Sequence, residues 1–191
     1  MYLKTNEKVI IITNSDEGWV QFSAEKYIPY LLPVVANYRI VSARTRYEQF
    51  YPGQPLCWKA AAFAHEVNER FLIAEEEKCM KKNIDVRREV ISFGDSMEER
   101  TAVKIVAGQL SCVPKSVMFI TSPTPIQLIG QLTMLTGQMK FVCESKKTLD
   151  LEINAQQAQK CADIFFKDND SSQQSLFSDS CHSASVPPIN S

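Results

Sequence analysis

The sequence predicts an α/β fold, a three-layer Rossmann-like sandwich built on a mostly parallel sheet. Short apolar runs rich in Val and Ile alternate along the chain with segments in which apolar residues recur at helical spacing. The clearest of these runs end in a polar residue rather than continuing. Continuous apolar strands are typical of parallel sheets, because helices cover both faces of such a sheet.

Six runs are predicted to be strands because they are rich in β-branched and aromatic residues. They are residues 8–15, 38–42, 90–93, 116–120, 140–143 and 148–153.

Helices are predicted between these strands wherever apolar residues recur every three or four positions. The first is expected to be capped by Ser23 and to be kinked or shortened by Pro29. The longest runs over residues 56–82, and another follows Met97. Thr124 is expected to cap the next one through a T-x-x-Q box, with Pro at the first helical position.

The domain organisation is predicted from a change in composition. Residues 1–155 are expected to form one α/β domain, and residues 156–166 a terminal helix. Residues 167–191 are dominated by Asp, Asn, Ser and Gln, so this stretch is expected to be a disordered polar tail.

Composition excludes several classes of function. A net charge of −1 over 191 residues argues against a nucleic-acid surface, and no apolar run is long enough to span a bilayer. The six cysteines contain no C-x-x-C pair, which favours free thiols in a reducing compartment. We therefore expect a cytoplasmic protein. His65 and His182 are the only histidines and lack ligand-like neighbours in sequence, so histidine catalysis is not expected.

The most informative stretch is residues 90–100, where an apolar strand runs into Gly94 and Asp95. Open α/β sheets bind ligands at the carboxyl ends of their strands, so Asp95 is a candidate functional residue. Two simpler interpretations stay open. Asp95 can be a solvated turn acid, and Ser96 with Glu99 matches a capping box that only satisfies backbone amides.

A second set of candidates lies nearer the amino terminus. Thr13 and Asn14 lie at the end of the first predicted strand and are expected to face the same crevice as Asp95. Lys59 falls in the first turn of the longest helix, where the helix dipole disfavours a cation, and an anionic ligand would explain it. Arg44 and Arg46 are either a further anion site or solvated surface charges.

Taken together, these polar positions resemble the haloacid-dehalogenase-like (HAD-like) superfamily of phosphohydrolases, and in particular HAD-like proteins of protists. The second family motif, an apolar strand ending in Ser or Thr, is matched by residues 9–13. The third, a lysine at a helix start, is matched by Lys59, and the fourth, G-D-x-x-x-[DE], by Gly94, Asp95 and Glu99. The resemblance covers about residues 8–153.

The resemblance implies a role for each matched residue. Thr13, with Asn14, would bind the transferring phosphoryl group, and Lys59 would neutralise charge on its oxygens. Asp95 with Glu99 would hold Mg²⁺, a cation that prefers carboxylate and water oxygens. The ligand implied is a phosphorylated small molecule or a phosphoprotein.

One motif of the family has no match. Its first motif, D-x-D-x-[TV] after an apolar strand, supplies the nucleophile and belongs before Lys8, where only residues 1–7 stand. The chain has a single D-x-D, residues 168–170, at the start of the polar tail. The resemblance therefore implies a member that is truncated at its amino terminus or catalytically inactive, with a sheet that is incomplete at its centre.

Two other interpretations stay open. The chain can be a non-catalytic relative that binds a partner or a phosphorylated ligand, or an unrelated Rossmann-like binding domain, although it has no glycine-rich phosphate loop. An incomplete sheet also predicts self-association, because unpaired strand edges accept foreign strands.

Overall fold

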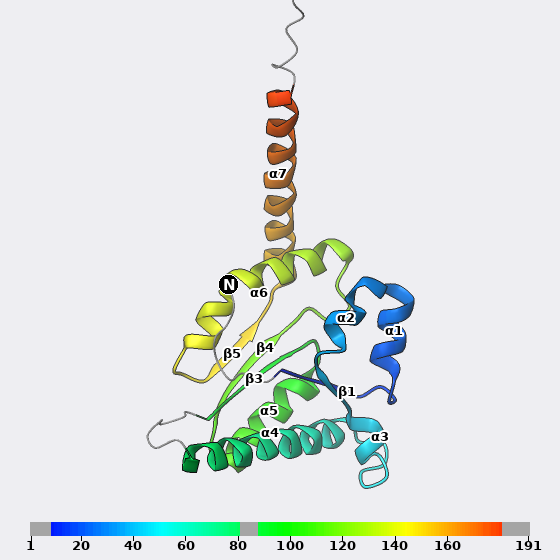
Figure 1. Cartoon of the computed structure of the whole chain (residues 1–191), viewed down its shortest axis with the longest axis vertical. Coiled ribbons are helices and arrows are strands. Elements are labelled where there is room, and N and C mark those ends of the chain that lie inside the picture. Colours follow the sequence, from blue (N-terminus) through cyan, green and yellow to red (C-terminus); the bar gives the residue numbers. More distant parts are fainter. Residues whose placement is uncertain (1–8, 81–87, 181–191) are drawn as a thin grey trace, which may run out of the picture. The chain divides into compact units, whose positions relative to one another are not determined.

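The structure is a computed structural model that describes residues 9–80 and 88–180, with the side chains of residues 74–80 and 168–180 outside the description. The chain alternates strands and helices, as Figure 1 shows. The strands are β1 (Ile10–Thr13), β2 (Arg39–Ser42), β3 (Glu89–Gly94), β4 (Val113–Met118) and β5 (Leu149–Glu152). The helices are α1 (Trp19–Tyr27), η1 (Pro29–Leu31), α2 (Leu32–Val35), α3 (Ala43–Tyr47), α4 (Pro55–Met80), α5 (Met97–Leu110), α6 (Pro125–Glu144) and α7 (Ala155–Ser180).

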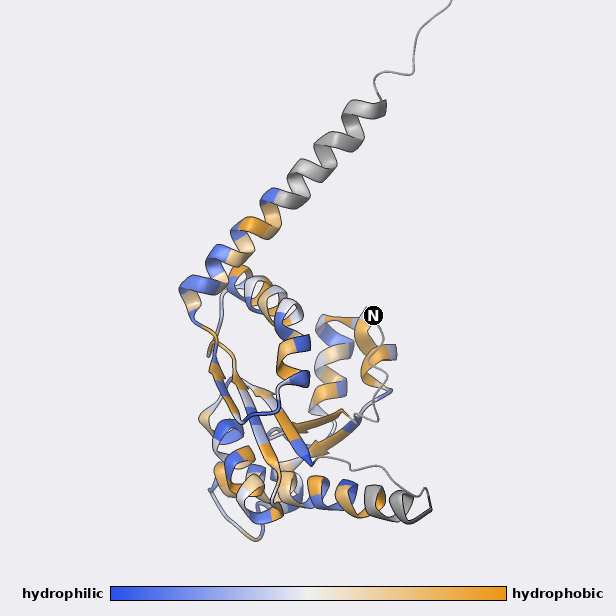
Figure 2. Cartoon of the chain, turned by 90° about the vertical axis from the view of Figure 1, so that its left-hand side faces the viewer, coloured by the Kyte–Doolittle hydropathy of each residue, from blue (hydrophilic) through white to orange (hydrophobic). Residues whose placement is uncertain are grey.

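The strands form two separate sheets, one of order β1-β2 and one of order β3-β4-β5. β1 pairs with β2 in parallel, with Ile10 opposite Arg39, and β3 pairs with β4 in parallel, with Glu89 opposite Val113. The predicted Rossmann-like α/β fold with an incomplete parallel sheet is therefore confirmed. Figure 2 shows apolar stretches on the strands that polar residues interrupt, as in β4 and β5.

The chain divides into two compact units, Met1–Met118 with Lys146–Leu151, and Phe119–Ser145 with Glu152–Ser191. The first unit contains β1 to β4, most of β5, and helices α1 to α5. The second contains α6 and α7, which pack closely against each other.

Helices cover both faces of the small sheet in the first unit. Val41 of β2 is buried against Trp58 and Ala62 of α4. The neighbouring residue Ile40 points the other way, toward Val20 of α1, because successive side chains of a strand alternate between faces. This arrangement is the expected layering of helix, sheet and helix.

A second core cluster joins the two sheets through helices α4 and α5. Phe63 of α4 and Val103 and Val106 of α5 are buried together, and Ile12 of β1 and Val90 of β3 both pack against this cluster. β1 and β3 therefore lie over one helical layer, although they belong to different sheets.

The structure confirms one predicted helix cap and corrects another. Thr124 accepts a hydrogen bond from the Gln127 amide at 3.2 Å, and the Gln127 side chain accepts one from the Thr124 amide at 3.0 Å. Ser23 is not an N-cap, because it lies inside α1 and its hydroxyl donates to the Trp19 carbonyl oxygen. Pro29 falls where α1 has ended and opens η1, in agreement with the prediction that it shortens the helix.

Two further segments differ from the expectation. Residues 140–143 were predicted to be a strand, but they form the last turn of α6. No Gly or Pro follows Gly137 within α6, so nothing ends the helix before Glu144. The terminal helix predicted over residues 156–166 extends to Ser180 as α7, since no helix breaker occurs in residues 155–180. Residues 181–191 lie outside the description.

Every helix within the described ranges is too short or too polar to cross a lipid bilayer.

Candidate functional site

Lys59 occupies the junction between the carboxyl ends of the two sheets. Its side chain is only 4% exposed, its ammonium donates to the Ile12 carbonyl oxygen at 3.0 Å, and it forms an ion pair with Glu99 Oε1 at 2.6 Å. The carbonyl dipole and the carboxylate compensate for the burial of a cation near the start of α4. The sequence identified this lysine as unusual, and the structure supplies two internal partners for it.

Glu99 is fixed from two sides. One carboxylate oxygen pairs with Lys59, and the other contacts the Ser96 hydroxyl. The capping-box interpretation of Ser96 and Glu99 is wrong, because Ser96, the N-cap residue of α5, makes no side-chain cap hydrogen bond and its hydroxyl contacts Glu99 instead. Burial by itself raises the pKa of the Glu99 carboxyl, but the hydrogen bonds from Lys59 and Ser96 outweigh it and hold that pKa below its ordinary value.

Gly94 is required by a close approach at this junction. A Cβ atom at this position would lie 2.6 Å from Glu99 Cγ and 3.0 Å from Glu99 Cβ. The Glu99 side chain therefore packs directly over the end of β3 and can reach Lys59 only because residue 94 has no side chain. The structural reason for a glycine at position 94 is the space that the Glu99 side chain needs.

The side chains of Thr13 and Asn14 form hydrogen bonds in the turn that follows β1. The Thr13 hydroxyl oxygen accepts a hydrogen bond from the Ser15 amide at 3.0 Å, which closes a tight turn. The Asn14 amide nitrogen donates to the Pro55 carbonyl oxygen at 3.2 Å, so it ties this turn to the start of α4. Asn14 Oδ1 is buried and has no hydrogen-bond partner within the described protein atoms.

Asp95 follows Gly94 directly and is exposed. The structure thus brings the end of β1, Lys59 and Glu99 into contact. Asp95 directly follows Gly94, over which the Glu99 side chain packs. A role of Asp95 in metal binding stays a prediction.

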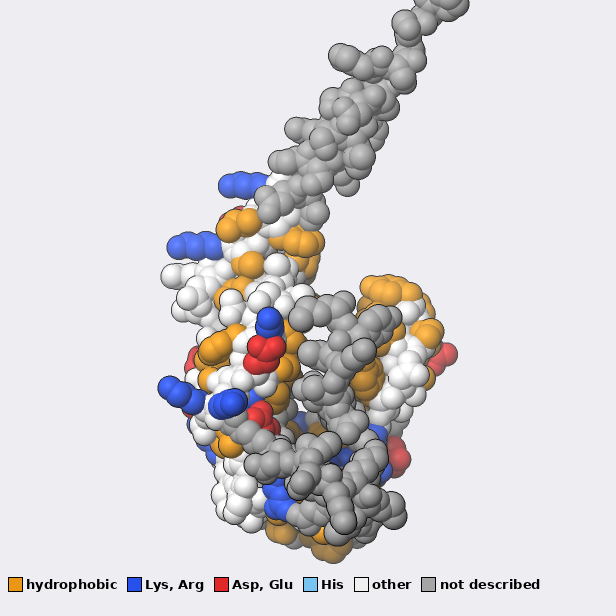
Figure 3. Space-filling view, turned by 60° about the vertical axis from the view of Figure 1, so that its left-hand side comes forward, with side chains coloured by type: hydrophobic (Ala, Val, Ile, Leu, Met, Phe, Trp, Pro, Cys, Tyr) orange, Lys and Arg blue, Asp and Glu red, His pale blue; other side chains and the backbone are white. Residues whose placement is uncertain are grey.

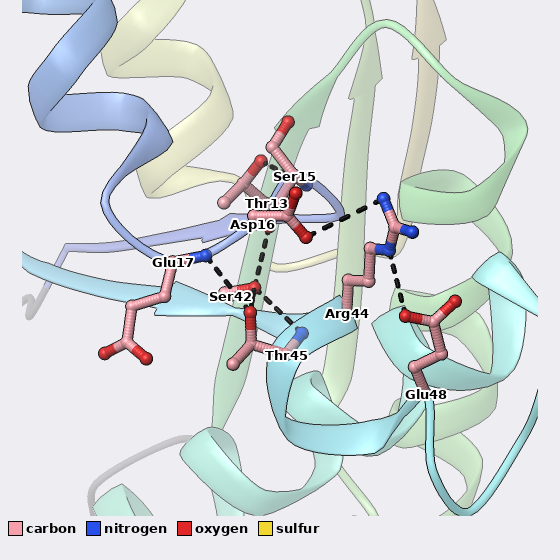
Figure 4. Close-up of polar contacts among 8 residues, drawn as sticks. All are labelled: Thr13, Ser15, Asp16, Glu17, Ser42, Arg44, Thr45 and Glu48. Carbon is pink, nitrogen blue, oxygen red and sulfur yellow. Dashed lines mark hydrogen bonds and ion pairs between the residues drawn. The ribbon is translucent and has the colours of Figure 1, made fainter.

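A polar cluster between β1 and β2 escaped the sequence analysis (Figure 4). Ser42, at the end of β2, caps α3 by accepting from the Thr45 amide at 3.0 Å, and its hydroxyl lies 2.7 Å from the Ser15 carbonyl oxygen. The Glu17 amide donates to Thr45 Oγ1 at 3.1 Å. The S-x-x-T spacing of residues 42–45 is the sequence signal for this cap.

A small cavity of about 50 Å³ lies beside this cluster, lined among others by Thr13, Asp16, Glu17 and Ser42. About 10–15 Å³ of such space is enough for one water molecule, so water fits in this cavity.

Arg44 and Arg46, which lie in α3 after β2, are held by acids of the chain itself. Arg44 pairs with Glu48 at 3.0 Å and with Asp16 at 3.7 Å, and Arg46 pairs with Glu66 at 3.2 Å (Figure 4 shows the Arg44 contacts). Glu66 is 1% exposed and is neutralised by Arg46 and Arg39 together. These ion pairs connect α4 to the β2 region and favour a structural role for both arginines.

One other group of potential metal ligands occurs among the described residues. His65, Glu66 and Glu69 have ligand atoms within 4.8 Å of one another, so His65 does have ligand-like neighbours, contrary to the sequence-based expectation. Both Arg39 and Arg46 already occupy the Glu66 carboxylate, and these fixed positive charges oppose a metal ion there.

The low pKa of Glu99 predicts a loss of stability in acid. A carboxyl whose pKa is lower in the folded state contributes stability above its unfolded pKa of about 4.3, and this contribution disappears as the pH falls through the folded-state pKa. We expect the free energy of unfolding to decrease below about pH 4.3, and to decrease less steeply in Glu99→Gln. Urea unfolding between pH 6 and pH 3 (roughly the range over which carboxylates titrate) measures this.

Glu98→Gln is the matched control, because it removes a neighbouring charge without touching Lys59. Arg100 and Lys104 hold the pKa of Asp150 below its ordinary value as well, so the comparison is best made in an Asp150→Asn background. An unchanged acid dependence in Glu99→Gln would contradict the proposed role of this ion pair.

Comparison with known proteins assigns no family. No protein-family model matches the chain, and neither a curated protein nor a solved structure matches it significantly. The fold class therefore rests on the structure, and the resemblance to HAD-like proteins rests on the motif residues alone.

Proposed function

We propose that the chain is a HAD-like phosphohydrolase-type domain that binds a phosphorylated ligand at the carboxyl edge of its sheets. The observation that carries the proposal is the buried Lys59 ammonium between the end of β1 and Glu99. A buried cation at the carboxyl edge of parallel strands is suited to stabilise phosphoryl oxygens.

Two donors support phosphate binding at this place. A lysine ammonium has three N–H groups, of which Ile12 and Glu99 engage two among the described contacts. The Thr13 hydroxyl accepts from the Ser15 amide and keeps its own proton to donate. One N–H of Lys59 and the O–H of Thr13 are the groups we assign to a phosphoryl oxygen, with Asn14 beside them.

Of the two acids predicted to bind magnesium, we retain Asp95 and not Glu99. Glu99 already contacts Lys59 and Ser96 with its carboxylate oxygens, so it fits poorly as a metal ligand. Asp95 is exposed at the end of β3 and is the residue we propose for Mg²⁺, which commonly binds through one carboxylate, water and the substrate phosphate. The ion would shield negative charge on the bound ligand.

Hydrolysis is not part of the proposal, because residues 9–80 and 88–180 place no candidate nucleophile at this edge. The only D-x-D of the chain, residues 168–170, lies on helix α7 rather than after a strand. Without a carboxylate nucleophile the retained groups bind phosphate but do not form a phosphoryl-enzyme intermediate.

Phosphate binding tests the proposal. Titration of the protein with inorganic phosphate, followed by calorimetry, should show weak millimolar binding that Thr13→Val reduces about tenfold, since one hydrogen bond to a charged group is lost. Thr136→Val is the matched control, because Thr136 only bonds its own helix in α6. With p-nitrophenyl phosphate and Mg²⁺, the unchanged protein should hydrolyse no more substrate than Asp95→Ala does, because hydrolysis is not part of the proposal.

Two results would overturn parts of this proposal. If the unchanged protein and Thr13→Val bind phosphate with equal affinity, the assignment of Thr13 to a phosphate site is wrong. Magnesium-dependent turnover that Asp95→Ala abolishes would show that a nucleophile exists, and Asp168 is then the first residue to replace.

A specific observation also favours the second interpretation, a non-catalytic interaction protein. The segment from α1 to α2 exposes large aromatic side chains at its surface, and Figure 3 shows apolar side chains gathered there. Trp19 and Phe22 are each 50% exposed, and Tyr30 is 76% exposed. Exposed apolar patches of this kind often mark sites of protein contact, so a protein partner is the alternative to a small phosphorylated ligand.

A further inference from the structure

The turn after β1 contains one polar atom that the described protein atoms leave without a hydrogen bond. Asn14 Oδ1 is buried, and among the described residues no donor bonds to it. A buried acceptor of this kind costs free energy until a donor reaches it, because it has given up its hydrogen bonds to bulk water. The donor that satisfies Asn14 Oδ1 therefore belongs to a bound molecule, which is either water or a ligand.

The orientation of the Asn14 amide is fixed by its other end. Its nitrogen donates a hydrogen bond to the Pro55 carbonyl oxygen at 3.2 Å. A carbonyl oxygen can only accept, so it selects the amide nitrogen as its neighbour and excludes the reversed amide. The atom without a partner is thus the amide oxygen, which accepts a hydrogen bond and cannot donate one.

Asn14 lies beside the groups that we assign to phosphate. Pro55 and Lys59 are four residues apart in α4, which is about one helical turn, so Asn14 contacts the turn that carries Lys59. The Lys59 ammonium bonds the Ile12 carbonyl oxygen, two residues before Asn14. The end of β1 is therefore joined to the start of α4 by two hydrogen bonds, made by the residues on either side of Thr13 in sequence.

These donors and this acceptor suit different parts of a ligand. One N–H of Lys59 and the Thr13 hydroxyl can donate to phosphoryl oxygens, which accept. Asn14 Oδ1 repels an ionised phosphoryl oxygen, since both carry negative charge and neither has a proton. At neutral pH a phosphate monoester is mostly a dianion, with a second pKa of about 6, so a ligand's donor must lie on its organic part. An ammonium group fits poorly there, because the Lys59 cation is near.

We propose that the phosphorylated ligand carries a hydroxyl group close to its phosphate, and that Asn14 Oδ1 accepts a hydrogen bond from that hydroxyl. The inference rests on the proposed function and narrows its ligand class to hydroxyalkyl phosphates. The Cα atoms of Thr13 and Asn14 are about 3.8 Å apart across a trans peptide, which places the hydroxyl within a few carbon atoms of the phosphate ester. Asn14 is thus a specificity-determining residue, distinct from the donors that hold the phosphate.

Two phosphate monoesters of nearly equal size test this inference. 2-Hydroxyethyl phosphate and n-propyl phosphate differ only in whether the chain ends in a hydroxyl or a methyl group. In calorimetry at about pH 8, where both phosphates are dianions, the unchanged protein should bind the hydroxyethyl ester about tenfold more tightly. Asn14→Ala should bind both esters with nearly equal affinity, because the acceptor is removed.

Asn37→Ala is the matched control. The Asn37 side-chain amide donates to the Pro33 carbonyl oxygen at 2.7 Å, which is the same type of bond that Asn14 makes with Pro55. This variant should keep the preference for the hydroxyethyl ester. A second measurement needs no variant and so does not depend on the folding of Asn14→Ala. In the unchanged protein, the NMR signal of the Asn14 side-chain amide should shift with the hydroxyethyl ester and not with the propyl ester.

Each result decides the proposal. A preference for the hydroxyethyl ester that Asn14→Ala loses and Asn37→Ala keeps supports it. Equal affinities of the unchanged protein for the two esters overturn it and leave the phosphate site intact, since Asn14 Oδ1 then bonds water in the complex. A preference that persists in Asn14→Ala also overturns it, because another group then binds the hydroxyl. If neither ester nor inorganic phosphate binds, the proposed function fails together with this inference.

Discussion

Replacing Lys59 with methionine is expected to lower the free energy of unfolding by about 3 kcal/mol. The ion pair with Glu99 is largely buried, with side chains 4% and 16% exposed, and the substitution leaves the carboxylate without its cation. Breaking a buried pair in this way costs about 3–5 kcal/mol, and the residual exposure of Glu99 favours the lower end. Urea denaturation at pH 7, followed by circular dichroism, measures the change.

Two variants make this result interpretable. Lys59→Met combined with Glu99→Leu should recover most of the loss, because no charge is then left unpaired at the junction. Lys140→Met removes an exposed lysine from α6 and should change stability by no more than about 0.5 kcal/mol. A Lys59→Met protein as stable as Lys140→Met would show that the ion pair does not form.

The same ion pair has a consequence for function. A buried charged pair costs desolvation energy that an apolar pair would avoid. Lys59 and Glu99 occupy the one place where the carboxyl ends of both sheets meet. We expect this pair to take part in the proposed phosphate binding as well as in stability. The double variant Lys59→Met/Glu99→Leu should keep the fold, so a loss of phosphate binding in it would show a binding role that is separate from the structural one.

The sequence predicted the elements that are set by local pattern. Ile10 to Ile12 and Val90 to Phe93 were identified as strands because β-branched apolar runs have few alternatives in a parallel sheet. The cap at Thr124 was predicted because both of its partners lie within three residues. Lys59 and Glu99 were both selected as site residues, although each was expected to face a ligand rather than the other.

The errors come from contacts that sequence spacing does not encode. Ser96 and Glu99 satisfy the spacing of a capping box, but Lys59, forty residues earlier in the chain, attracts the carboxylate instead. Residues 140–143 have the composition of a strand, and only the continuation of α6 decides their conformation. Local propensity is a weak guide where tertiary contacts compete with it.

The second unit depends on a contact that is also invisible in the sequence. α6 and α7 pack through small side chains, and Gly130, Ala158 and Ala162 are buried at or near this contact. A glycine inside a helix is unfavourable by about 1 kcal/mol relative to alanine, so its presence at position 130 requires a reason. The reason is that the backbone of α7 approaches α6 there.

Replacing Gly130 with alanine should therefore be strongly destabilising to the second unit. The added Cβ would overlap the Ala158 carbonyl oxygen and lie 3.1 Å from Ala158 Cα, and a backbone cannot move aside as a flexible side chain can. Overpacking typically costs about 1–3 kcal/mol, and we expect the upper end of this range or separation of the helices. The measurement is hydrogen exchange of the α7 amides around Ala158 and Ala162.

Gly137→Ala is the matched control, because it adds the same methyl group to the same helix where no atom lies within 4 Å. Alanine at position 137 should stabilise α6 by up to about 1 kcal/mol through helix propensity alone. The two substitutions are thus expected to act in opposite directions, with faster exchange around Ala158 in Gly130→Ala and unchanged or slower exchange in Gly137→Ala. If both variants exchange alike in α7, the close contact between the two helices is absent in solution, and α7 is held to α6 in some other way.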